Sequence, residues 1–322
     1  MIKSIIRETL LLPKIPQHLK NRQRVLSSAD KEKLEHSLRE NFFSKNKDSY
    51  LNSSIGSKDL NDHLTGRLEA DRSSVIPWLD SVMRLDAKRI LEIGCGTGAS
   101  TIALAEQGAN LIGIDVDSLA IRDAKTRCKL YDLNVEFHLC NAVDIELLFS
   151  HKQFDMIIFY ASLEHMTYHE RIASLSSAWN LLGSGGVLAI IETPNRLWYF
   201  DSHTSNLPFF HWLPDELAME YSKMSSRESF NKGFSTQASD DYTKFMRWGR
   251  GMSYHELELA ISDIELKESI NCLADFIRNQ RFLSWLKWRI SKIHSYQTIL
   301  NKQNPAISHA FLESYLNLTI KK

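Results

Sequence analysis

The hydrophobic pattern of the chain changes near residue 88. Beyond it, short apolar runs typical of buried strands alternate with stretches in which apolar residues recur at helical spacing. The predicted strands cover residues 89–94, 110–115, 135–140, 154–160 and 185–192, and the predicted helices cover 99–107, 118–131, 144–149 and 168–182. Continuous apolar strands that alternate with helices predict an α/β fold, a doubly wound and mostly parallel sheet with helices on both faces.

The segment before this alternation has a different pattern. Residues 1–62 are expected to form an N-terminal helical extension and linker, with an amphipathic stretch from Ile2 to Leu10, a charged helix at 29–42 and a polar, turn-rich loop at 42–62. A helix is expected from His63 to Arg84, broken or restarted near Pro77. The main domain is therefore expected to cover residues 63–322.

Residues 195–252 interrupt the alternation after the fifth strand. They are rich in aromatic residues and show little strand periodicity, so we expect an insertion. An insertion at the ligand-binding edge of such a sheet commonly forms a lid or pocket wall, although for a single aromatic residue a hydrophobic cluster is the simpler interpretation. Ser253 and Glu256 form a capping box that restarts a helix, and the residues from 264 onward are expected to supply the last strands and one or two closing helices.

Composition narrows the class of protein. The 322-residue chain is 43% hydrophobic and carries no formal net charge, which gives no electrostatic steering toward nucleic acid. Its four cysteines, Cys95, Cys128, Cys140 and Cys272, form no CxxC pair and indicate a reducing compartment. No stretch approaches the ~18 apolar residues of a membrane span, and Arg7 and Glu8 interrupt the apolar N-terminus. These features predict a cytoplasmic protein.

Three glycines follow the first predicted strand in the sequence LEIGCGTGAS, residues 91–100. Gly94, Gly96 and Ala99, with Asp115 further on, meet the pattern of a dinucleotide-binding loop. Glu92, however, is unfavourable beside a pyrophosphate and suits a ligand with a cationic amine. S-adenosylmethionine carries an α-ammonium and a sulfonium but no phosphate, so the charge of this loop favours it as the cofactor.

Together with four later motifs, this loop resembles the class I S-adenosylmethionine-dependent methyltransferases. The motifs are LIGIDVDSLAI, CNAVDI, FDMIIFYASLEHM and LLGSGGVLAIIETPN, and the match covers roughly residues 67–195. Leu-Glu-His after the fourth strand and the sequence PNR after the fifth resemble the quinone-biosynthesis subgroup. The resemblance implies a Rossmann-like fold, S-adenosylmethionine as cofactor and methyl transfer to a small molecule.

The resemblance also implies which residues bind the cofactor. Asp115 corresponds to the residue that binds both ribose hydroxyls, Val116 lies beside the adenine, and Asn141 stands where the family more often has Asp. The full set of cofactor-binding residues is expected to be Glu92, Gly94, Cys95, Gly96, Gly98, Asp115, Val116, Asn141, Ala142 and Tyr160.

A hydroxyl acceptor must lose its proton as it attacks the methyl group, which requires a nearby base. His165 is the first candidate, because it follows the fourth strand at the edge where ligands bind in open α/β sheets. A histidine that caps the following helix or forms a hydrogen bond with the backbone is an equally plausible interpretation. Glu164 is a candidate to orient His165, and His203 in the insertion is the reserve base. The spacing of Asp201, His203 and His211 is poor support for a metal, and we expect none.

The sequence leaves several functions open. We expect an enzyme that methylates a small molecule, most often at oxygen. The alternatives are a protein or nucleic-acid methyltransferase, an NAD-linked oxidoreductase and a catalytically inactive cofactor-binding subunit. Residues 278–294 form a basic stretch that contains Trp285 and Trp288, for which packing on the sheet is favoured over contact with a membrane surface. The sequence does not indicate an oligomeric state.

Overall fold

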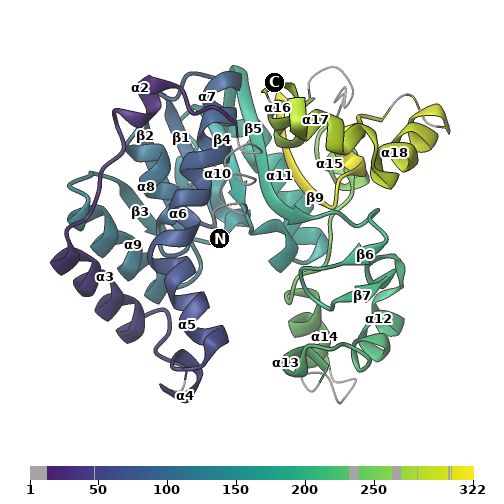
Figure 1. Cartoon of the computed structure of the whole chain (residues 1–322), viewed down its shortest axis with the longest axis horizontal. Coiled ribbons are helices and arrows are strands. Elements are labelled where there is room, and N and C mark those ends of the chain that lie inside the picture. The colour runs from purple at the N-terminus through teal and green to yellow at the C-terminus, as the bar shows by residue number, and fades with distance from the viewer. Residues whose placement is uncertain are drawn as a thin grey trace.

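The computed structural model describes residues 13–46, 48–231, 239–262, 270–280, 282–303, 305 and 307–322 (Figure 1). Its centre is a seven-stranded sheet in the order β3-β2-β1-β4-β5-β9-β8. The parallel strands are β1 (Arg89–Ile93), β2 (Asn110–Asp115), β3 (Glu136–Leu139), β4 (Phe154–Tyr160) and β5 (Leu182–Pro194). β9 (Tyr315–Lys321) pairs antiparallel with β5 and with β8 (Ile270–Cys272). The predicted α/β fold and its five parallel strands are confirmed.

Side chains of the strands point alternately into two hydrophobic cores, as expected for a sheet covered on both faces. Ile90 of β1 and Ile158 of β4 pack with α8 (Ala99–Ala105), α9 (Ser118–Leu130) and α7 (Ile76–Val82). Leu91 and Ile157 pack on the other face with α10 (Ile145–Phe149), α11 (Tyr168–Leu181) and α15 (Tyr254–Ala260). The doubly wound architecture therefore follows from apolar residues on both faces of the central strands.

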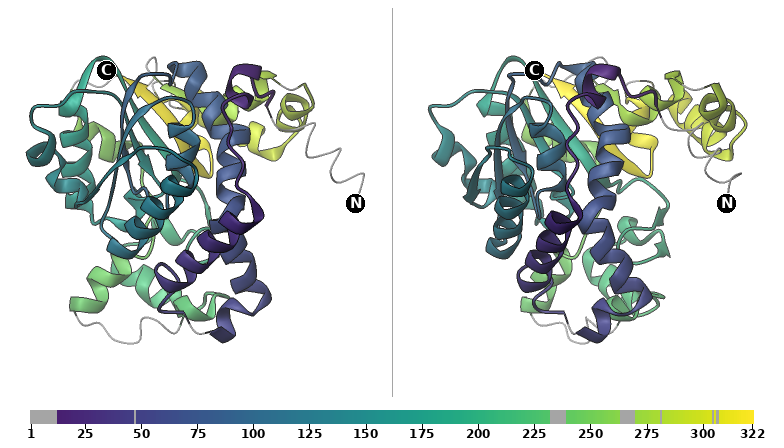
Figure 2. Two further views of the ribbon diagram at one scale, coloured as in Figure 1. Left: turned by 90° about the vertical axis from the view of Figure 1, so that its left-hand side faces the viewer. Right: turned by 60° about the vertical axis from the view of Figure 1, so that its left-hand side comes forward.

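The N-terminal helices pack on the first of these faces (Figure 2). They are α2 (Gln17–Lys20), α3 (Ser28–Glu40), α4 (Asp48–Leu51), α5 (Ser54–Asn61), the π-helical turns η1 (Asp62–Gly66) and η2 (Asp71–Val75), and α6 (Arg67–Ala70) between them. The predicted amphipathic stretch from Ile2 to Leu10 lies outside the described residues.

Residues 42–62 are largely helical, so the expected loop is wrong. The polar composition concealed the helix α5, whose N-cap Ser53 accepts the N–H of Gly56 with its hydroxyl and which buries Leu60. The restart expected near Pro77 is confirmed. The wide turn η2 ends at Val75 and α7 begins at Ile76, so Pro77, which cannot donate a backbone hydrogen bond, lies in the first turn of α7.

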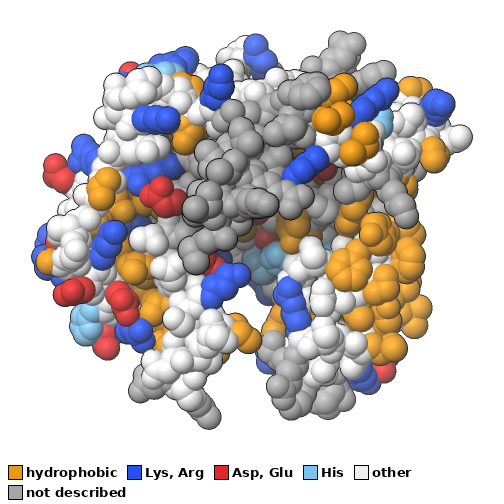
Figure 3. All heavy atoms as spheres, viewed as in Figure 1, with side chains coloured by type: hydrophobic (Ala, Val, Ile, Leu, Met, Phe, Trp, Pro, Cys, Tyr) orange, Lys and Arg blue, Asp and Glu red, His pale blue; other side chains and the backbone are white. Residues whose placement is uncertain are grey.

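The insertion leaves the sheet at Asn195 and rejoins it at Met252, where the two residues form a parallel bridge. It contains β6 (Phe200–Asp201), β7 (Leu207–Pro208), η5 (Phe210–Trp212), α12 (Asp215–Ser222), α13 (Glu228–Asn231) and α14 (Ser239–Met246). Phe210, Phe230 and Phe245 form the centre of a separate hydrophobic core. Apolar side chains also gather on the surface over β6, β7 and α12, among them Tyr199, Phe209, Trp212 and Leu217 (Figure 3).

The C-terminal part supplies β8, α16 (Leu273–Gln280), α17 (Phe282–Arg289), α18 (Lys292–Gln303), η6 (His309–Leu312) and β9. In the basic stretch, Trp285, Leu286 and Ile290 are exposed, so these apolar residues do not pack on the sheet as expected. Arg281 lies outside the described residues. No helix in the described part of the chain is long and apolar enough to cross a membrane.

Candidate active site

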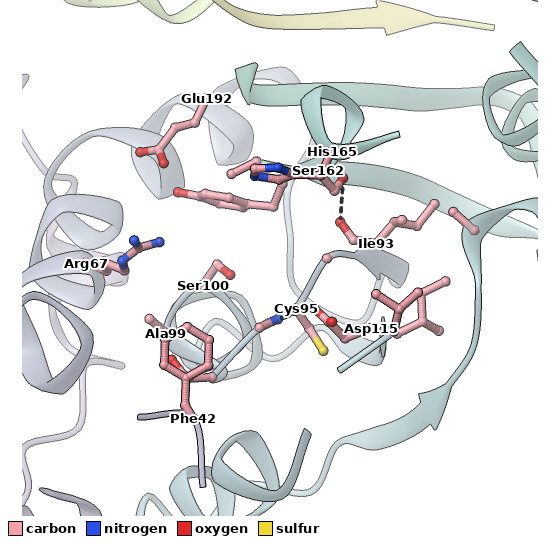
Figure 4. Close-up of a pocket in the computed structure, with 18 of the residues that line it drawn as sticks. Phe42, Arg67, Ile93, Cys95, Ala99, Ser100, Asp115, Ser162, His165 and Glu192 are labelled. Carbon is pink, nitrogen blue, oxygen red and sulfur yellow. Dashed lines mark hydrogen bonds between the residues drawn. The ribbon is translucent and has the colours of Figure 1, made fainter. Parts of the chain in front are cut away.

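A cavity of about 610 Å³ opens at the carboxyl ends of the parallel strands (Figure 4). Its walls come from the glycine loop after β1, the ends of β2, β4 and β5, the helices η1, α6 and η2, and Arg247 of the insertion. The edge at which parallel strands end is where open α/β sheets bind ligands. The cavity therefore lies where the sequence pattern predicted it.

The glycine loop follows the carboxyl end of β1 and has a backbone conformation that requires glycine. Gly94 has φ +85°, and a Cβ there would lie 2.8 Å from the carbonyl oxygen of Tyr160. Gly94, Cys95 and Gly96 line the cavity. Gly98 does not line it; a Cβ on Gly98 would meet Ala124 of α9 at 2.9 Å, so this glycine permits close packing of α8 on α9.

Glu92 lies beneath the loop and is fully buried. Its carboxylate accepts hydrogen bonds from the hydroxyls of Ser100 and Thr101 at the start of α8, the latter at 2.6 Å. Burial raises the pKa of Glu92 to about 7, although both hydroxyl bonds oppose this shift. Glu92 does not line the cavity, whereas Ser100 does, so any contribution of Glu92 to a ligand passes through α8 and the loop.

Asp115 is the last residue of β2, and its side chain lines the cavity next to the glycine loop (Figure 4). Its Oδ2 accepts the N–H of Gly96 at 2.8 Å, and its Oδ1 accepts the N–H of Asp117 at 2.9 Å. Burial raises the pKa of Asp115, and the backbone hydrogen bonds counteract that effect. The carboxylate is thus held rigidly against the glycine loop, with lone pairs left for two further donors.

Val116, Asn141 and Ala142 continue the cavity wall beyond Asp115. Val116 is an exposed apolar side chain, and Asn141 caps η3 (Ala142–Asp144) by accepting the N–H of Val143 at 3.3 Å. Together these residues can hold a nucleoside. The exposed apolar side chain can contact the face of the base, the polar groups near Asn141 can bind its edge, and the carboxylate can bind the ribose.

The other end of the cavity carries a polar group that sequence reasoning missed. Tyr160, at the end of β4, donates its hydroxyl to Asp71, whose pKa burial raises. Arg67, one helical turn before Asp71, points its guanidinium into the cavity (Figure 4). The i, i+4 spacing of Arg67 and Asp71 on one helix face was the available signal.

Glu192 also faces this end of the cavity (Figure 4). It has φ +58°, and the pairing of β5 with β9 shifts register between Ile190 and Thr193. Such a bulge turns a side chain that would otherwise follow the sheet alternation. Burial raises the pKa of Glu192 and Arg67 opposes this shift. In the sequence, the only signal was an acidic residue that ends the apolar run VLAII.

His165 lies at the end of η4 (Leu163–His165), directly after β4, and lines the cavity. Its Nδ1 lies 3.0 Å from the carbonyl oxygen of Arg247, and about half of its side chain is exposed. Thr167, rather than His165, caps the following helix α11 by a capping box with Glu170. The capping role considered for His165 is therefore wrong, whereas the alternative of a hydrogen bond to the backbone is confirmed.

Glu164 and His203 lie behind His165 and do not line the cavity. Glu164 is fully buried, and its Oε1 lies 3.9 Å from Nε2 of His165 and 4.0 Å from Nε2 of His203. Burial raises the pKa of Glu164, and His165 partly offsets this effect. Burial lowers the pKa of His203 to about 4.

Asp201 organises the insertion rather than the cavity. It accepts the backbone N–H groups of His203, Thr204 and Ser205 and lies 3.3 Å from Nε2 of His211. Among the described residues, no group of three or more His, Cys, Asp or Glu side chains is arranged to hold a metal ion.

The structure thus brings together most of the predicted residues. The cavity is lined by Gly94, Cys95, Gly96, Asp115, Val116, Asn141, Ala142, Tyr160 and His165, whereas Glu92, Gly98, Glu164 and His203 support it from behind. Five carboxylates line it, from Asp62, Asp71, Asp115, Glu170 and Glu192, against the guanidinium groups of Arg67 and Arg247. Arg247 forms an ion pair with Glu170. This balance suits a cationic ligand better than a pyrophosphate.

Comparison with known proteins agrees with this geometry. Residues 90–186 match the family model described as a methyltransferase domain. The ubiquinone biosynthesis O-methyltransferase of Coxiella burnetii is 33% identical over 122 residues, which are 38% of this chain and 50% of that protein. The demethylmenaquinone methyltransferase of Tropheryma whipplei is 33% identical over 105 residues, 33% of this chain and 41% of that protein. The chain therefore spans half or less of the length of these relatives.

A solved structure, the magnesium protoporphyrin IX methyltransferase of Synechocystis PCC 6803 with bound S-adenosylmethionine, aligns with a TM-score of 0.38 and 20% identity. The alignment covers 56% of this chain and 83% of that one. The matched segment contains β1 to the start of β5, together with the glycine loop and Asp115. The segment that matches the methyltransferase-domain model thus has the motif order and the sheet topology of the class I S-adenosylmethionine-dependent methyltransferases, which the sequence resembles.

Proposed function

We propose that this protein transfers the methyl group of S-adenosylmethionine to a hydroxyl oxygen of a small-molecule acceptor. The observation that carries the proposal is the continuity of the cavity, which runs from Asp115 past the glycine loop to His165. Cofactor and acceptor would share one space, as direct methyl transfer requires. The names of the Coxiella burnetii and Tropheryma whipplei relatives support a small-molecule acceptor.

The residues present fit the cofactor from end to end. Asp115 has lone pairs for both ribose hydroxyls, and Val116 and Asn141 lie where the adenine would sit. Arg67 supplies a guanidinium for the methionine carboxylate, which a guanidinium binds in a bidentate manner. The surrounding carboxylates suit the ammonium and sulfonium charges. When bound, the cofactor supplies an electrophilic methyl group.

Alignment supplies much of the catalysis in such a displacement. The chain must also remove a proton from a hydroxyl acceptor. The carbonyl of Arg247 can only accept a hydrogen bond, so Nδ1 of His165 carries the hydrogen. The basic atom of the neutral ring is therefore Nε2. A proton taken there lies 3.9 Å from the carboxyl group of Glu164.

Transfer of label tests the proposal. The purified chain is incubated with S-adenosylmethionine labelled at the methyl group and with separate small-molecule, protein and nucleic-acid fractions of a cell extract. We expect label in the small-molecule fraction, linked through oxygen and reduced with the Asp115→Ala variant at cofactor concentrations below its raised Kd. Label confined to protein or nucleic acid, or none in any fraction, contradicts the proposal.

A further inference from the structure

Glu164 is a buried carboxylate without enough partners. Its Oε2 accepts a long hydrogen bond of 3.4 Å from the hydroxyl of Thr193, and its Oε1 has no hydrogen-bond partner. The nearest groups to Oε1 are the Nε2 atoms of His165 and His203, at 3.9 and 4.0 Å. A buried, unpaired carboxylate is costly, so what these two nitrogens carry decides how Glu164 is stabilised.

The hydrogen bonds of the two rings fix which nitrogen carries hydrogen. As shown above, His165 donates from Nδ1 to the carbonyl of Arg247. In His203, Nδ1 lies 2.9 Å from the hydroxyl of Thr204, and that hydroxyl donates to the carbonyl of Gly249 at 2.7 Å. The hydroxyl must therefore accept from His203. In both neutral rings Nε2 has a lone pair, and both lone pairs lie beside Glu164.

The surrounding donors are already engaged. Arg171, the cation nearest to Glu164 on α11, gives its N–H groups to the carbonyls of Met166, Arg250 and Gly251. Arg227 donates to the carbonyls of Ser202 and His203. Among the described residues, four further groups of charged or titratable side chains lie around these three. They are Glu256 beside Arg171, Tyr315 beside the His203 ring, Glu170 and Arg247 near His165, and Asp201 and His211 near His203. None of these places a hydrogen between the three atoms.

Oε1 of Glu164 thus lies 3.9 and 4.0 Å from two lone-pair nitrogens of different segments, so a small side-chain movement brings either nitrogen within hydrogen-bond distance of it. Oε1 of Glu164 and the two Nε2 atoms all carry lone pairs, which repel one another. One hydrogen on any of the three atoms turns this repulsion into attraction. We infer that His165, Glu164 and His203 share one proton at neutral pH and act as a single proton-accepting unit that joins the insertion to the methyl-transfer edge. The resting proton lies on Glu164, which leaves both rings neutral and His165 able to act as a base.

The role of this unit in catalysis rests on the proposed function. As the acceptor attacks, its O–H bond breaks, its oxygen–methyl bond forms and the sulfur–methyl bond of the cofactor breaks. The proton goes to Nε2 of His165. The hydrogen on Glu164 can then pass to Nε2 of His203, whose side chain is 31% exposed, and from there to solvent. The hydrogen on Nε2 of His165 then passes to the ionised Glu164. One proton has entered from the cavity and one has left on the insertion side, so the unit returns to its starting state.

Nitrogen-15 NMR of the histidine rings tests proton sharing without cofactor or acceptor. His165→Gln and His203→Gln assign the two signals, and His169→Gln, which removes an exposed ring one turn away, is the matched control. Above neutral pH, we expect both rings in the form with hydrogen on Nδ1. Each ring should titrate in two steps in the wild type and in a single step in Glu164→Gln, because glutamine keeps a donor but cannot release it.

Hydrogen on Nε2 in either ring, or single-step curves for both rings in the wild type, overturns the inference. Binding of one zinc ion per chain at this position, lost in His203→Gln, also overturns it. Measurements of turnover separate the two proposals: coupled titration without methyl transfer contradicts only the proposed function. Methyl transfer with independent titrations contradicts only the shared proton.

Discussion

Substitution of Asp115 by alanine removes the group that we assign to the cofactor ribose. The carboxylate holds the N–H groups of Gly96 and Asp117 at 2.8 and 2.9 Å, and it has remaining lone pairs on the cavity side. In Asp115→Ala, two ribose hydroxyls lose a charged acceptor in a partly enclosed site, and the glycine loop loses its anchor. The expected loss of binding free energy is about 1–3 kcal/mol, which corresponds to an increase in Kd of about 5- to 150-fold.

Isothermal titration calorimetry with S-adenosylmethionine measures this change. Asp132→Ala is the matched control, because Asp132 is a fully exposed carboxylate away from the cavity. Thermal unfolding of both variants without cofactor separates a loss of fold from a loss of binding. An unchanged Kd in Asp115→Ala, with the fold intact, would refute the reasoning.

Three further predictions follow from the site. His165→Ala should lower turnover by about 10²- to 10⁴-fold with little change in the Kd of the cofactor; if His203→Ala does so instead, the base belongs to the insertion. The pKa of Glu92 is raised on folding, so its contribution to stability is present at low pH and is lost as the pH rises toward 7. As the pH rises toward 7, the Tm of the wild type should therefore fall relative to the Tm of Glu92→Gln. If the Tm values of the two proteins change with pH in parallel, Glu92 does not ionise in a buried position. Hydrogen exchange in residues 195–231 and 239–250 should slow when cofactor and acceptor bind, whereas unchanged exchange identifies the insertion as a fixed layer.

The strands and the cofactor loop were predictable because their signals are local. Continuous apolar runs such as MIIFY occur where both faces of a strand are buried, and Gly94 is needed wherever a loop passes this close to a neighbouring strand. Asp115 was predictable for the same reason, since its distance from the loop is set by a single strand–helix–strand unit.

The rest of the site depends on contacts that are distant in sequence. Arg67 and Asp71 face the cavity because a long helix with two wide turns crosses the sheet edge, and polar composition in the segment before it resembled a loop. Glu192 enters the cavity through a bulge that forms against β9, more than a hundred residues later in the chain. The proximity of Glu164 to His203 depends on how the insertion folds back, which no local pattern encodes.

Calorimetric titration of the wild-type chain with S-adenosylmethionine, S-adenosylhomocysteine and NAD tests the central claim most directly. The carboxylate-lined cavity with Asp115 beside the glycine loop predicts that the first two bind with one site per chain and that NAD does not. Binding of NAD in preference to S-adenosylmethionine, or binding of neither, would contradict the assignment of this cavity to methyl transfer.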